Sequence, residues 1–375
     1  MAAPKLLFFV TEDWYFCSHR LPLAIAAREA GYEVAVLTRV QHHAAQIEAA
    51  GLRLIPFDLS RRGKNPLREF AVLCRLCRVY RREKPDLVHQ VALKPVLYGS
   101  LAAWLAGVPH VVNALAGLGH LFTSGGWLTG LLRACIKLAF RALLNGGRRK
   151  VIVQNPDDFR LLVEACGLKP EVGVLIRGSG VDLAQFRCVP EPEGVPLVVL
   201  PTRVLWTKGV GEFVEAARRL KAEGVAARFA LVGDPDPENP AAVPPDQLDA
   251  WRREGAVECW GRRDDMAEVL AGCHIVCLPS YREGLPKALI EAAAAGRAIV
   301  TTDTPGCREV VRAGDNGLLV PARDAKALAE ALRGLIADAD SRRRMGQRGR
   351  EIAEAEFSVE RVAAETLAVY RALLS

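Results

Sequence analysis

The sequence predicts an α/β protein of two doubly wound parallel-sheet domains that face a cleft. Its 375 residues suffice for about two domains, at roughly 100–200 residues each. Short apolar runs rich in β-branched residues alternate with Ala-, Leu- and Arg-rich helical stretches. This alternation is typical of parallel sheets covered on both faces. One Pro/Glu/Gly-rich piece interrupts it near the middle of the chain.

Each apolar run is a candidate strand. In the first half these runs are residues 6–10, 33–37, 52–56, 87–89, 110–113 and 151–154. In the second half they are residues 197–200, 228–232, 275–278, 299–301 and 318–320.

The interrupting piece, CVPEPEGVP at residues 188–196, suits neither a helix nor a strand. We therefore predict an N-terminal domain over residues 1–187 and a C-terminal domain over residues 188–358. The last helical stretch, residues 359–375, follows the strands of the second domain, and we expect it to pack back on the first.

Charge is distributed unevenly between the halves. The whole chain has 50 Lys and Arg against 43 Asp and Glu, a net charge of +7. Residues 1–190 hold 25 basic and 14 acidic side chains (+11), which leaves 25 and 29 (−4) for residues 191–375. The two halves thus face different partners, or the basic half faces an anionic surface.

The cysteines indicate the cellular compartment, and the apolar stretches indicate whether the chain spans a membrane. The ten cysteines are irregularly spaced and no signal peptide precedes them, so we expect reduced thiols in a cytoplasmic protein. The longest apolar stretch, Trp127–Leu144, carries Arg133, Lys137 and Arg141. Three cations in a bilayer core are too costly, so we predict no membrane span.

The usual nucleotide and metal motifs are missing. There is no G-x-x-x-x-G-K-[ST] and no H-E-x-x-H, which disfavours a P-loop enzyme and a zinc protease. Gly209 and Gly211 open a helical stretch after a strand, but Val214 stands where a dinucleotide fingerprint has its third glycine.

Two carboxylates and two cations form the candidate site. Glu283 and Glu291 are separated by seven residues, and Pro286 between them is a favourable first helical residue. A helix starting there offers amides to an anion such as a diphosphate, and both glutamates can accept hydrogen bonds from polyol hydroxyls. Arg203 and Lys208 follow a predicted strand and suit a phosphate pair. On spacing alone, solvated surface charges are the commoner explanation of all four. The buried-looking strand before Glu283, the small-residue run from Glu291, and the position of both cations after a strand favour a site instead.

Together these motifs resemble a known family. Arg203-x4-Lys208 and Glu283-x7-Glu291, with GSGVD at residues 178–182, are similar to family 4 of the retaining glycosyltransferases, which have the GT-B architecture of two facing Rossmann-like domains. In the first half, SHRLPLA, HQVALKPVLYGSLAA and VNALAGLGH resemble a bacterial branch. Members of that branch transfer hexosamines or hexoses to undecaprenyl-diphosphate-linked sugars.

The resemblance implies a role for each motif residue. Arg203 and Lys208 would hold the donor diphosphate and stabilise the leaving nucleoside diphosphate, Glu283 would bind the transferred sugar, and Glu291 the ribose. The remaining positions implied on the nucleotide side are Gly233, Arg262, Gly284, Leu285 and Pro286. The nucleotide-sugar, with UDP favoured over GDP, is a substrate, and neither a cofactor nor a metal is expected.

In the first half the sequence departs from the wider family. The segment EDWYFCSHR at residues 12–20 replaces a Gly-Gly loop, and Ala116 stands where many members have a histidine. We expect that His120 or His19 could take over this role near the reacting sugar, although a histidine in such a loop is more often a hydrogen-bonded loop residue than a catalyst. Lys94 and Tyr98 are expected on the acceptor side.

Two basic stretches predict the environment of the acceptor. Residues 117–150 contain six Lys or Arg and no acid, and residues 61–82 contain eight cations against Glu69 alone. Basic amphipathic helices suit the anionic inner leaflet of a membrane, although packing on the first sheet explains either helix equally well. We therefore expect a cytoplasmic enzyme, peripheral on the inner membrane, with a lipid-linked glycan acceptor.

Two other functions compete with glycosyl transfer. A nucleotide-sugar epimerase of the same architecture is disfavoured by Glu283-x7-Glu291 and by the basic first half. A nucleic-acid binder needs aromatic residues interleaved with the cations, and aromatic residues make up only 6% of the chain. The sequence does not specify the oligomeric state.

Overall fold

The computed structural model describes residues 3–59, 65–115, 117 and 127–375. It divides the chain into two compact units. The first unit comprises Met1–Gly180 together with Val359–Ser375, and the second comprises Val181–Ser358.

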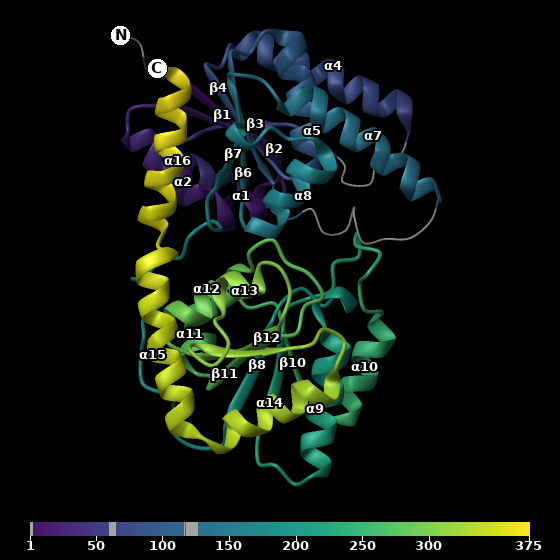
Figure 1. Cartoon of the computed structure of the whole chain (residues 1–375), viewed down its shortest axis with the longest axis vertical. Coiled ribbons are helices and arrows are strands. Elements are labelled where there is room, and N and C mark those ends of the chain that lie inside the picture. The colour runs from purple at the N-terminus through teal and green to yellow at the C-terminus, as the bar shows by residue number, and fades with distance from the viewer. Residues whose placement is uncertain (1–2, 60–64, 116, 118–126) are drawn as a thin grey trace. The chain divides into compact units, whose positions relative to one another are not determined.

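The first unit is built on a seven-stranded parallel sheet (Figure 1). In spatial order its strands are β3 (Arg53–Pro56), β2 (Glu33–Arg39), β1 (Lys5–Glu12), β4 (Leu87–Val91), β5 (His110–Leu115), β6 (Arg149–Val153) and β7 (Gly173–Leu175). The inner strands are almost wholly buried because helices cover both faces.

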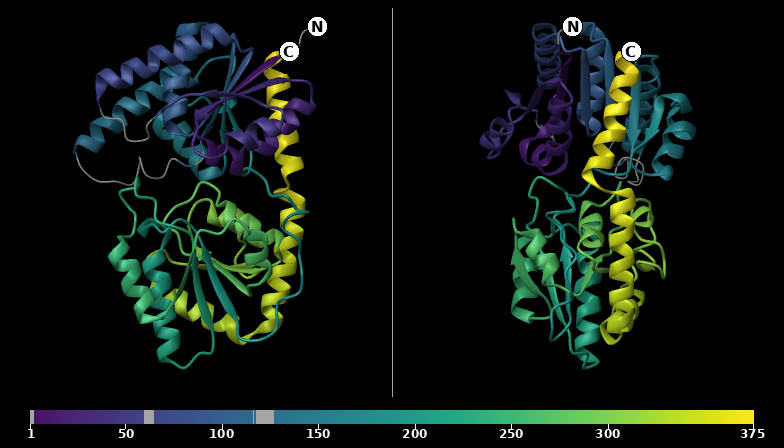
Figure 2. Two further views of the ribbon diagram at one scale, coloured as in Figure 1. Left: turned by 180° about the vertical axis from the view of Figure 1, so that it is seen from behind. Right: turned by 90° about the vertical axis from the view of Figure 1, so that its left-hand side faces the viewer.

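Helices form a layer on each face of this sheet. Side chains from α2 (Leu21–Glu29), α3 (Ala44–Ala49) and α16 (Val359–Leu374) join one core cluster. On the opposite face pack α4 (Pro66–Glu83), α5 (Leu93–Ala106), α7 (Trp127–Leu144) and α8 (Pro156–Cys166), as Figures 1 and 2 show.

The second unit has a six-stranded parallel sheet. Its strands, in spatial order, are β10 (Glu258–Gly261), β9 (Arg228–Val232), β8 (Leu197–Pro201), β11 (Ile275–Leu278), β12 (Ala298–Thr302) and β13 (Gly317–Val320). Its helices are α9 (Val210–Ala222), α10 (Pro245–Glu254), α11 (Met266–Ala271), α12 (Lys287–Ala294), α13 (Cys307–Val310), α14 (Ala325–Ala337) and α15 (Ala339–Glu356). Both sheets have the doubly wound order expected from the sequence.

Two strands, β7 and β10, were not predicted from the sequence, and both are short strands at a sheet edge. β7 has three residues and begins at a glycine, and every residue of β10 is only half-buried. Neither has the continuous apolar run that marks an inner strand. The other two edge strands, β3 and β13, have apolar runs and were predicted, so the weak apolar signal of β7 and β10 explains why these two were missed.

The segment expected as a loop after β1 is instead the helix α1 (Asp13–His19). Asp13 is buried, and its carboxylate accepts hydrogen bonds from the main-chain N–H groups of Trp14, Gln41, His42 and His43. Desolvation is the largest single influence and raises the pKa of Asp13, but the four hydrogen bonds together outweigh it, so the pKa lies below its ordinary value. The loop after β2 therefore holds the start of α1 in place.

The second unit begins at Val181 rather than at residue 188. The Val181 N–H donates to the Phe357 carbonyl, and Phe186 lies in the core of the second unit. The proline-rich piece at residues 188–196 is thus fastened to the second unit and is not a free linker.

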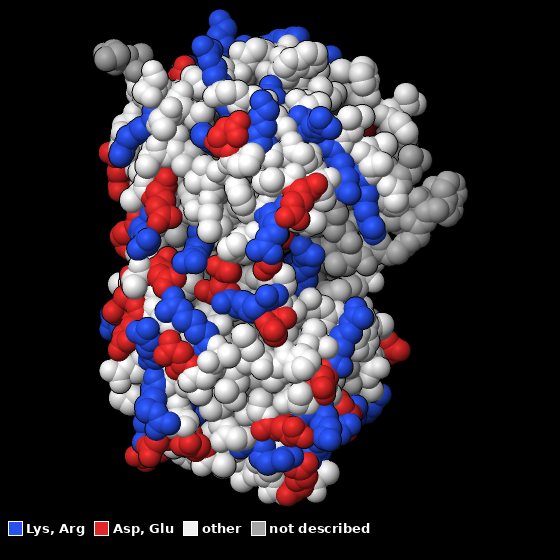
Figure 3. Space-filling view, viewed as in Figure 1, with Lys and Arg blue, Asp and Glu red and all other residues white. Residues whose placement is uncertain are grey.

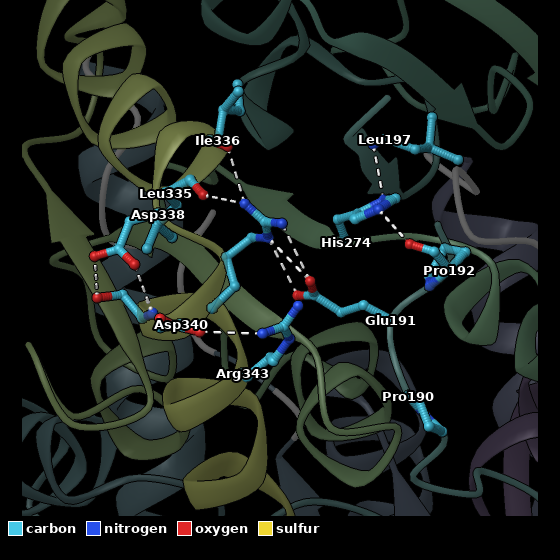
Figure 4. A network of polar contacts seen from close by, with 12 residues as sticks. Pro190, Glu191, Pro192, Leu197, His274, Leu335, Ile336, Asp338, Asp340 and Arg343 are labelled. Carbon is cyan, nitrogen blue, oxygen red and sulfur yellow. Dashed lines mark hydrogen bonds and ion pairs between the residues drawn. The ribbon is translucent and has the colours of Figure 1, made fainter. Parts of the chain in front are cut away.

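Buried polar contacts hold this piece (Figure 4). Arg342 of α15 donates to the Glu191 carboxylate and to the carbonyls of Leu335 and Ile336. Nε2 of His274 lies 3.0 Å from the carbonyl oxygen of Pro192, and Nδ1 of His274 accepts a hydrogen bond from the Leu197 N–H. The sequence indicated a break here because its prolines and glycine interrupt helices and strands. The contacts that hold the piece join residues far apart in the chain and could not be predicted in this way.

The C-terminal helix α16 belongs to the core of the first unit. Val362, Leu367 and Tyr370 are buried in the cluster that also contains Phe8 of β1. The Tyr370 hydroxyl lies 2.5 Å from Nδ1 of His89, a fully buried histidine in β4. The position of α16 on the first unit agrees with the expectation for residues 359–375.

Surface charge on the second unit is largely paired. Figure 3 shows blue and red side chains side by side over this unit, and many of them are ion pairs such as Arg218–Glu254 and Arg228–Glu258. All ten cysteines are unpaired thiols. Over the described ranges, no helix is both long and apolar enough to cross a membrane.

Candidate active site

The site is built on the loops that leave the carboxyl ends of β8 and β11, which are neighbours in the second sheet. The loop after β8 carries Arg203 and Lys208, and the loop after β11 carries Glu283. Pro286 is the N-cap of α12 rather than its first residue, so the helix begins at Lys287. In parallel α/β sheets this edge is where ligands bind.

Main-chain contacts tie the two loops together. The Thr207 carbonyl accepts hydrogen bonds from the Tyr281 N–H at 2.9 Å and from the Ser280 hydroxyl at 3.2 Å. Gly209 has a φ of 71°, and a Cβ there would lie 2.0 Å from the Pro279 carbonyl oxygen. Only glycine permits this close approach, which places Lys208 beside the second loop.

Lys208 and Glu283 form an ion pair. Their Nζ and Oε1 atoms are 2.5 Å apart, and their side chains are 19% and 11% exposed. The structure therefore brings together two predicted site residues that lie 75 positions apart in the chain. An ammonium and a carboxylate at one open edge can serve a phosphate and a sugar hydroxyl, respectively.

Arg203 takes a partner that the sequence did not indicate. Its NH1 lies 2.7 Å from Oδ2 of Asp236, in the loop after β9. Gly233 lets the loop after β9 approach the loop after β8. Its φ is 143°, and a Cβ at this position would lie 1.9 Å from the Thr202 carbonyl oxygen. Three successive strands of the sheet, β9, β8 and β11, thus supply the loops of the site.

The remaining nucleotide-side residues lie around these loops. Glu291, in α12, accepts from Lys287 at 2.5 Å, and Arg262 pairs with Asp264 at 3.0 Å just after β10. Leu285 is buried, and the Gly284 carbonyl packs against the start of α13 at Gly306. The spacing of Lys287 four residues before Glu291 was a signal that could have revealed this pair.

Tyr281 joins three segments at the same edge. Its hydroxyl donates to Oε1 of Glu212 in α9 at 2.6 Å, and the Arg323 guanidinium lies over its ring, 4.7 Å from the centroid. Burial, and then the Glu212 bond, raise the pKa of Tyr281 to about 12, so its hydroxyl stays a donor. No sequence motif pointed to these three residues.

On the first unit, Lys94 and Tyr98 of α5 meet Glu69 of α4. Lys94 lies 2.8 Å from the Glu69 carboxylate and its ammonium sits over the Tyr98 ring, 5.3 Å from the centroid. Burial, and then the hydrogen bond to Glu69, raise the pKa of Tyr98 to about 12. Glu69, the single acid of the basic stretch at residues 61–82, therefore forms an ion pair with Lys94, a predicted acceptor-side residue.

The two predicted histidines differ in what the structure describes. His19 ends α1 and stacks on Tyr15, with ring centroids 4.2 Å apart and planes 8° from parallel. His120 lies outside the described residues. Among the described residues, no cluster of three or more His, Cys, Asp or Glu side chains could hold a metal ion.

Comparison with known proteins covers both units. Residues 5–155 match the model described as glycosyl transferase 4-like, and residues 195–338 match glycosyl transferases group 1. A transferase of Campylobacter jejuni is 31% identical over 85% of this chain and 86% of its own length. The chain belongs to glycosyltransferase family 4.

Solved glycosyltransferases share its fold. A Rickettsia africae glycosyltransferase superposes with a TM-score of 0.79 over 100% of both chains at 16% identity. Anabaena HepE, solved with UDP and glucose, superposes with a TM-score of 0.78 over 97% of this chain and 99% of its own at 18% identity. The glycosyltransferase therefore has the GT-B architecture that the sequence predicted.

The two family matches divide the candidate residues of this glycosyltransferase. The group 1 match contains Arg203, Lys208, Glu283 and Glu291, and the 4-like match contains His19, Lys94 and Tyr98. The Campylobacter relative is named N,N'-diacetylbacillosaminyl-diphospho-undecaprenol alpha-1,3-N-acetylgalactosaminyltransferase. Putative glycosyltransferase EpsD of Bacillus subtilis is 26% identical over 99% of this chain and 97% of its own length.

Proposed function

We propose that the chain is a retaining, metal-independent glycosyltransferase that moves a sugar from a UDP-sugar to a lipid-linked glycan. The sugar is an N-acetylhexosamine or a hexose, and the pathway is bacterial surface polysaccharide or glycoprotein glycan assembly. The observation that carries the proposal is the Lys208–Glu283 pair at the carboxyl edge of β8 and β11. The name of the Campylobacter relative supports an undecaprenyl-diphosphate-linked acceptor.

The charges at this edge suit the departing nucleotide. Breaking a glycosyl–phosphate bond leaves negative charge on the diphosphate and positive charge on the sugar ring. Arg203 and Lys208 stabilise the diphosphate by preorganised charge, and electrostatic stabilisation of this kind usually contributes most to catalysis. Glu283 accepts hydrogen bonds from the transferred sugar, with Gly284, Leu285 and Pro286 beside it, and Glu291 binds the ribose.

Retention follows from attack on the face from which the nucleotide leaves. A donor phosphate oxygen takes the proton of the acceptor hydroxyl, the new glycosidic bond forms, and the sugar–phosphate bond breaks. Glu283 is not a nucleophile in this scheme. Lys94 and Tyr98 bind the acceptor, and His19 or His120 lies near the reacting sugar.

Nucleotide binding tests the donor half of this proposal. We expect UDP to raise the unfolding temperature of the purified chain, since a ligand at about 100 times its Kd adds about 2.7 kcal/mol to the unfolding free energy. GDP and ADP, added separately, should have little effect. Stabilisation by GDP alone would mean that the donor is a GDP-sugar. An unfolding temperature that no nucleotide changes would contradict the donor site.

The exposed face of α4 supports a membrane-bound acceptor. Leu67 and Phe70, 81% and 66% exposed, precede the exposed residues Arg75, Arg78 and Arg82 on one side of the helix. Of the two acids of α4, Glu69 pairs with Lys94, and Glu83 pairs with Arg53 and with Arg82. Arg75 and Arg78 therefore keep their charge without a carboxylate partner in the described part of the chain. Apolar side chains beside arginines suit an anionic bilayer surface on the cytoplasmic side of the inner membrane.

Vesicle flotation tests this surface. We expect binding to phosphatidylglycerol vesicles and little binding to phosphatidylcholine, with loss on substituting Leu67→Ser and Phe70→Ser together. Arg252→Gln and Arg253→Gln, on α10 of the second unit, serve as a control for charge. Equal binding by the Leu67/Phe70 variant and the wild type would contradict docking through α4.

A further inference from the structure

Arg323 differs from five other cations at the carboxyl edge of the second sheet. Arg203, Lys208, Arg262, Lys287 and Arg308 each pair with a carboxylate. Arg323, exposed in the loop after β13, has no carboxylate within ion-pair distance in the described part of the chain. Its charge is therefore not neutralised by a neighbour.

The Arg323 guanidinium contacts the face of the Tyr281 ring, and this is its one contact with a side chain that the structure describes. A guanidinium stacked on an aromatic ring keeps all its N–H donors in its own plane, where they remain available. None of the Arg323 nitrogens has a hydrogen-bond partner among the described residues. The contact with the ring thus holds the guanidinium without using any of its N–H donors.

Tyr281 connects this cation to the donor site. Its N–H donates to Thr207, the residue before Lys208, and it lies two residues before Glu283. Its hydroxyl is fixed by Glu212. The ring that carries Arg323 is therefore part of the loop pair that positions Lys208 and Glu283.

The backbone of Arg323 supports a specific use for this side chain. Its φ is 64°, in the left-handed region that favours glycine, and it lies immediately before Asp324, the N-cap of α14. A glycine would fit this turn without strain. An arginine occupies this position although its backbone conformation favours glycine. We infer that the side chain has a use of its own.

We propose that Arg323 is a further phosphate-binding residue, which donates hydrogen bonds to the diphosphate of the nucleotide-sugar. This inference rests on the proposed function, because it assigns a third cation, after Arg203 and Lys208, to the same ligand. A guanidinium whose donors are unused matches the oxygens of a phosphate. The lipid carrier also has a diphosphate, but Arg323 shares its unit and sheet edge with the donor residues, so we assign it to the nucleotide.

Calorimetric titration of Arg323→Gly with UDP tests this assignment. We expect UDP binding about 10- to 100-fold weaker than in the wild type, because a hydrogen bond to a charged group is lost. Uridine, which has no phosphate, should bind both proteins equally. The unfolding temperature should stay near that of the wild type, since glycine suits a φ of 64°.

Two variants control the titration. Arg323→Lys keeps the charge without the planar donors and should retain part of the UDP affinity. Arg333→Gln removes an arginine of α14 that pairs with Glu223 at 2.7 Å, and should leave UDP binding unchanged. Farnesyl diphosphate, titrated separately, distinguishes the lipid carrier from the nucleotide.

Several results would overturn the assignment. These are equal UDP affinity in Arg323→Gly and the wild type, an equal loss for UDP and uridine with a lower unfolding temperature, and a loss confined to farnesyl diphosphate. In each case the wild type still binds UDP, so the proposed function survives. If the wild type binds no nucleoside diphosphate, both the proposed function and this assignment fail.

Discussion

The Lys208 ammonium group lies 2.5 Å from Oε1 of Glu283. Both side chains are therefore held before a ligand arrives, and each neutralises the other. A diphosphate that binds Lys208 has to compete with Glu283, while a sugar hydroxyl that binds Glu283 weakens the same pair. Donor binding at this edge is thus an exchange of partners, favoured when phosphate and sugar are presented together.

Removing either partner should slow transfer severely. We expect Lys208→Ala and Glu283→Ala each to lower the transfer rate by about 100- to 1,000-fold, because a preorganised charge at the reacting groups is lost. The rate is measured with UDP-N-acetylhexosamine and a lipid-linked acceptor. Unfolding temperatures should show a folded protein in both cases, since both side chains stay partly exposed and lie in loops at the edge of the sheet.

A surface pair in the same unit is the matched control for this experiment. Glu254→Ala removes the partner of Arg218, 2.5 Å away on the outside of the domain. Transfer by this variant should equal that of the wild type. Normal turnover by Lys208→Ala or Glu283→Ala would remove these residues from the reaction.

The close approach of the two loops gives a second prediction. Gly209→Ala places a Cβ 2.0 Å from the Pro279 carbonyl oxygen at a φ of 71°, so the loops must separate. We expect the free energy of unfolding, from urea denaturation, to fall by about 2–4 kcal/mol through strain and overpacking together. UDP stabilisation should fall as well, since Lys208 adjoins this glycine.

Gly224→Ala isolates the effect of the contact. Gly224 has a φ of 75°, but nothing lies within 4 Å of its would-be Cβ. The conformational cost alone, about 1 kcal/mol, should appear in that variant, with UDP stabilisation intact. Equal losses in the two variants would mean that the contact with Pro279 does not contribute.

Strand order explains why the pairing of Lys208 with Glu283 could be anticipated. Both residues follow buried strands with strong apolar signals, and β8 and β11 are neighbours in the sheet. Once a doubly wound sheet is predicted, its carboxyl edge collects such residues. The four inner strands of this sheet were predictable because each is a continuous apolar run, and the last helix because its helical stretch is long.

Contacts between distant loops could not be read from the sequence. Asp236 lies 33 positions from Arg203 and Glu212 lies 69 positions from Tyr281, and no spacing rule connects residues that far apart. The helix α1 was missed because its start depends on Asp13 binding the loop after β2. Such features depend on tertiary packing, which overrides local propensity.

Burial of His89 predicts a pH dependence of stability. Desolvation, followed by the charge of Arg20, lowers the pKa of His89 well below its ordinary value near 6.5. The unfolded chain gains a proton below pH 6.5 that the folded chain does not bind, so the free energy of unfolding should fall as pH decreases below 6.5. Each such group contributes up to about 1.4 kcal/mol per pH unit.

Urea denaturation between pH 5 and pH 8 measures this slope. His274, whose pKa burial also lowers, contributes in the same direction, so His89→Gln should make the slope shallower without abolishing it. Tyr370→Phe removes the partner on α16 but leaves the buried imidazole, and should reduce stability while keeping the slope. An unchanged slope in His89→Gln would show that His89 is not the responsible group.

The buried pair of Arg342 and Glu191 gives the last prediction. Their side chains are only 6% and 10% exposed, and Glu191 lies in the segment that leads into β8. Glu191→Ala leaves a buried guanidinium with carbonyl partners alone, and we expect a loss of about 3–5 kcal/mol in the free energy of unfolding. Replacing both residues, Glu191→Leu with Arg342→Met, should cost less than Glu191→Ala because no charge remains buried.

The position of this pair separates its effect from catalysis. His274, in the same network, binds Leu197 at the amino end of β8 and immediately precedes β11, whereas Lys208 and Glu283 follow the carboxyl ends of these strands (Figure 4). UDP affinity measured well below the unfolding temperature should therefore be unchanged in Glu191→Ala. Arg343→Ala, which removes an exposed pair with Asp340, is the control and should cost no more than about 1 kcal/mol. Equal losses in Glu191→Ala and Arg343→Ala would show that the buried pair does not hold the segment.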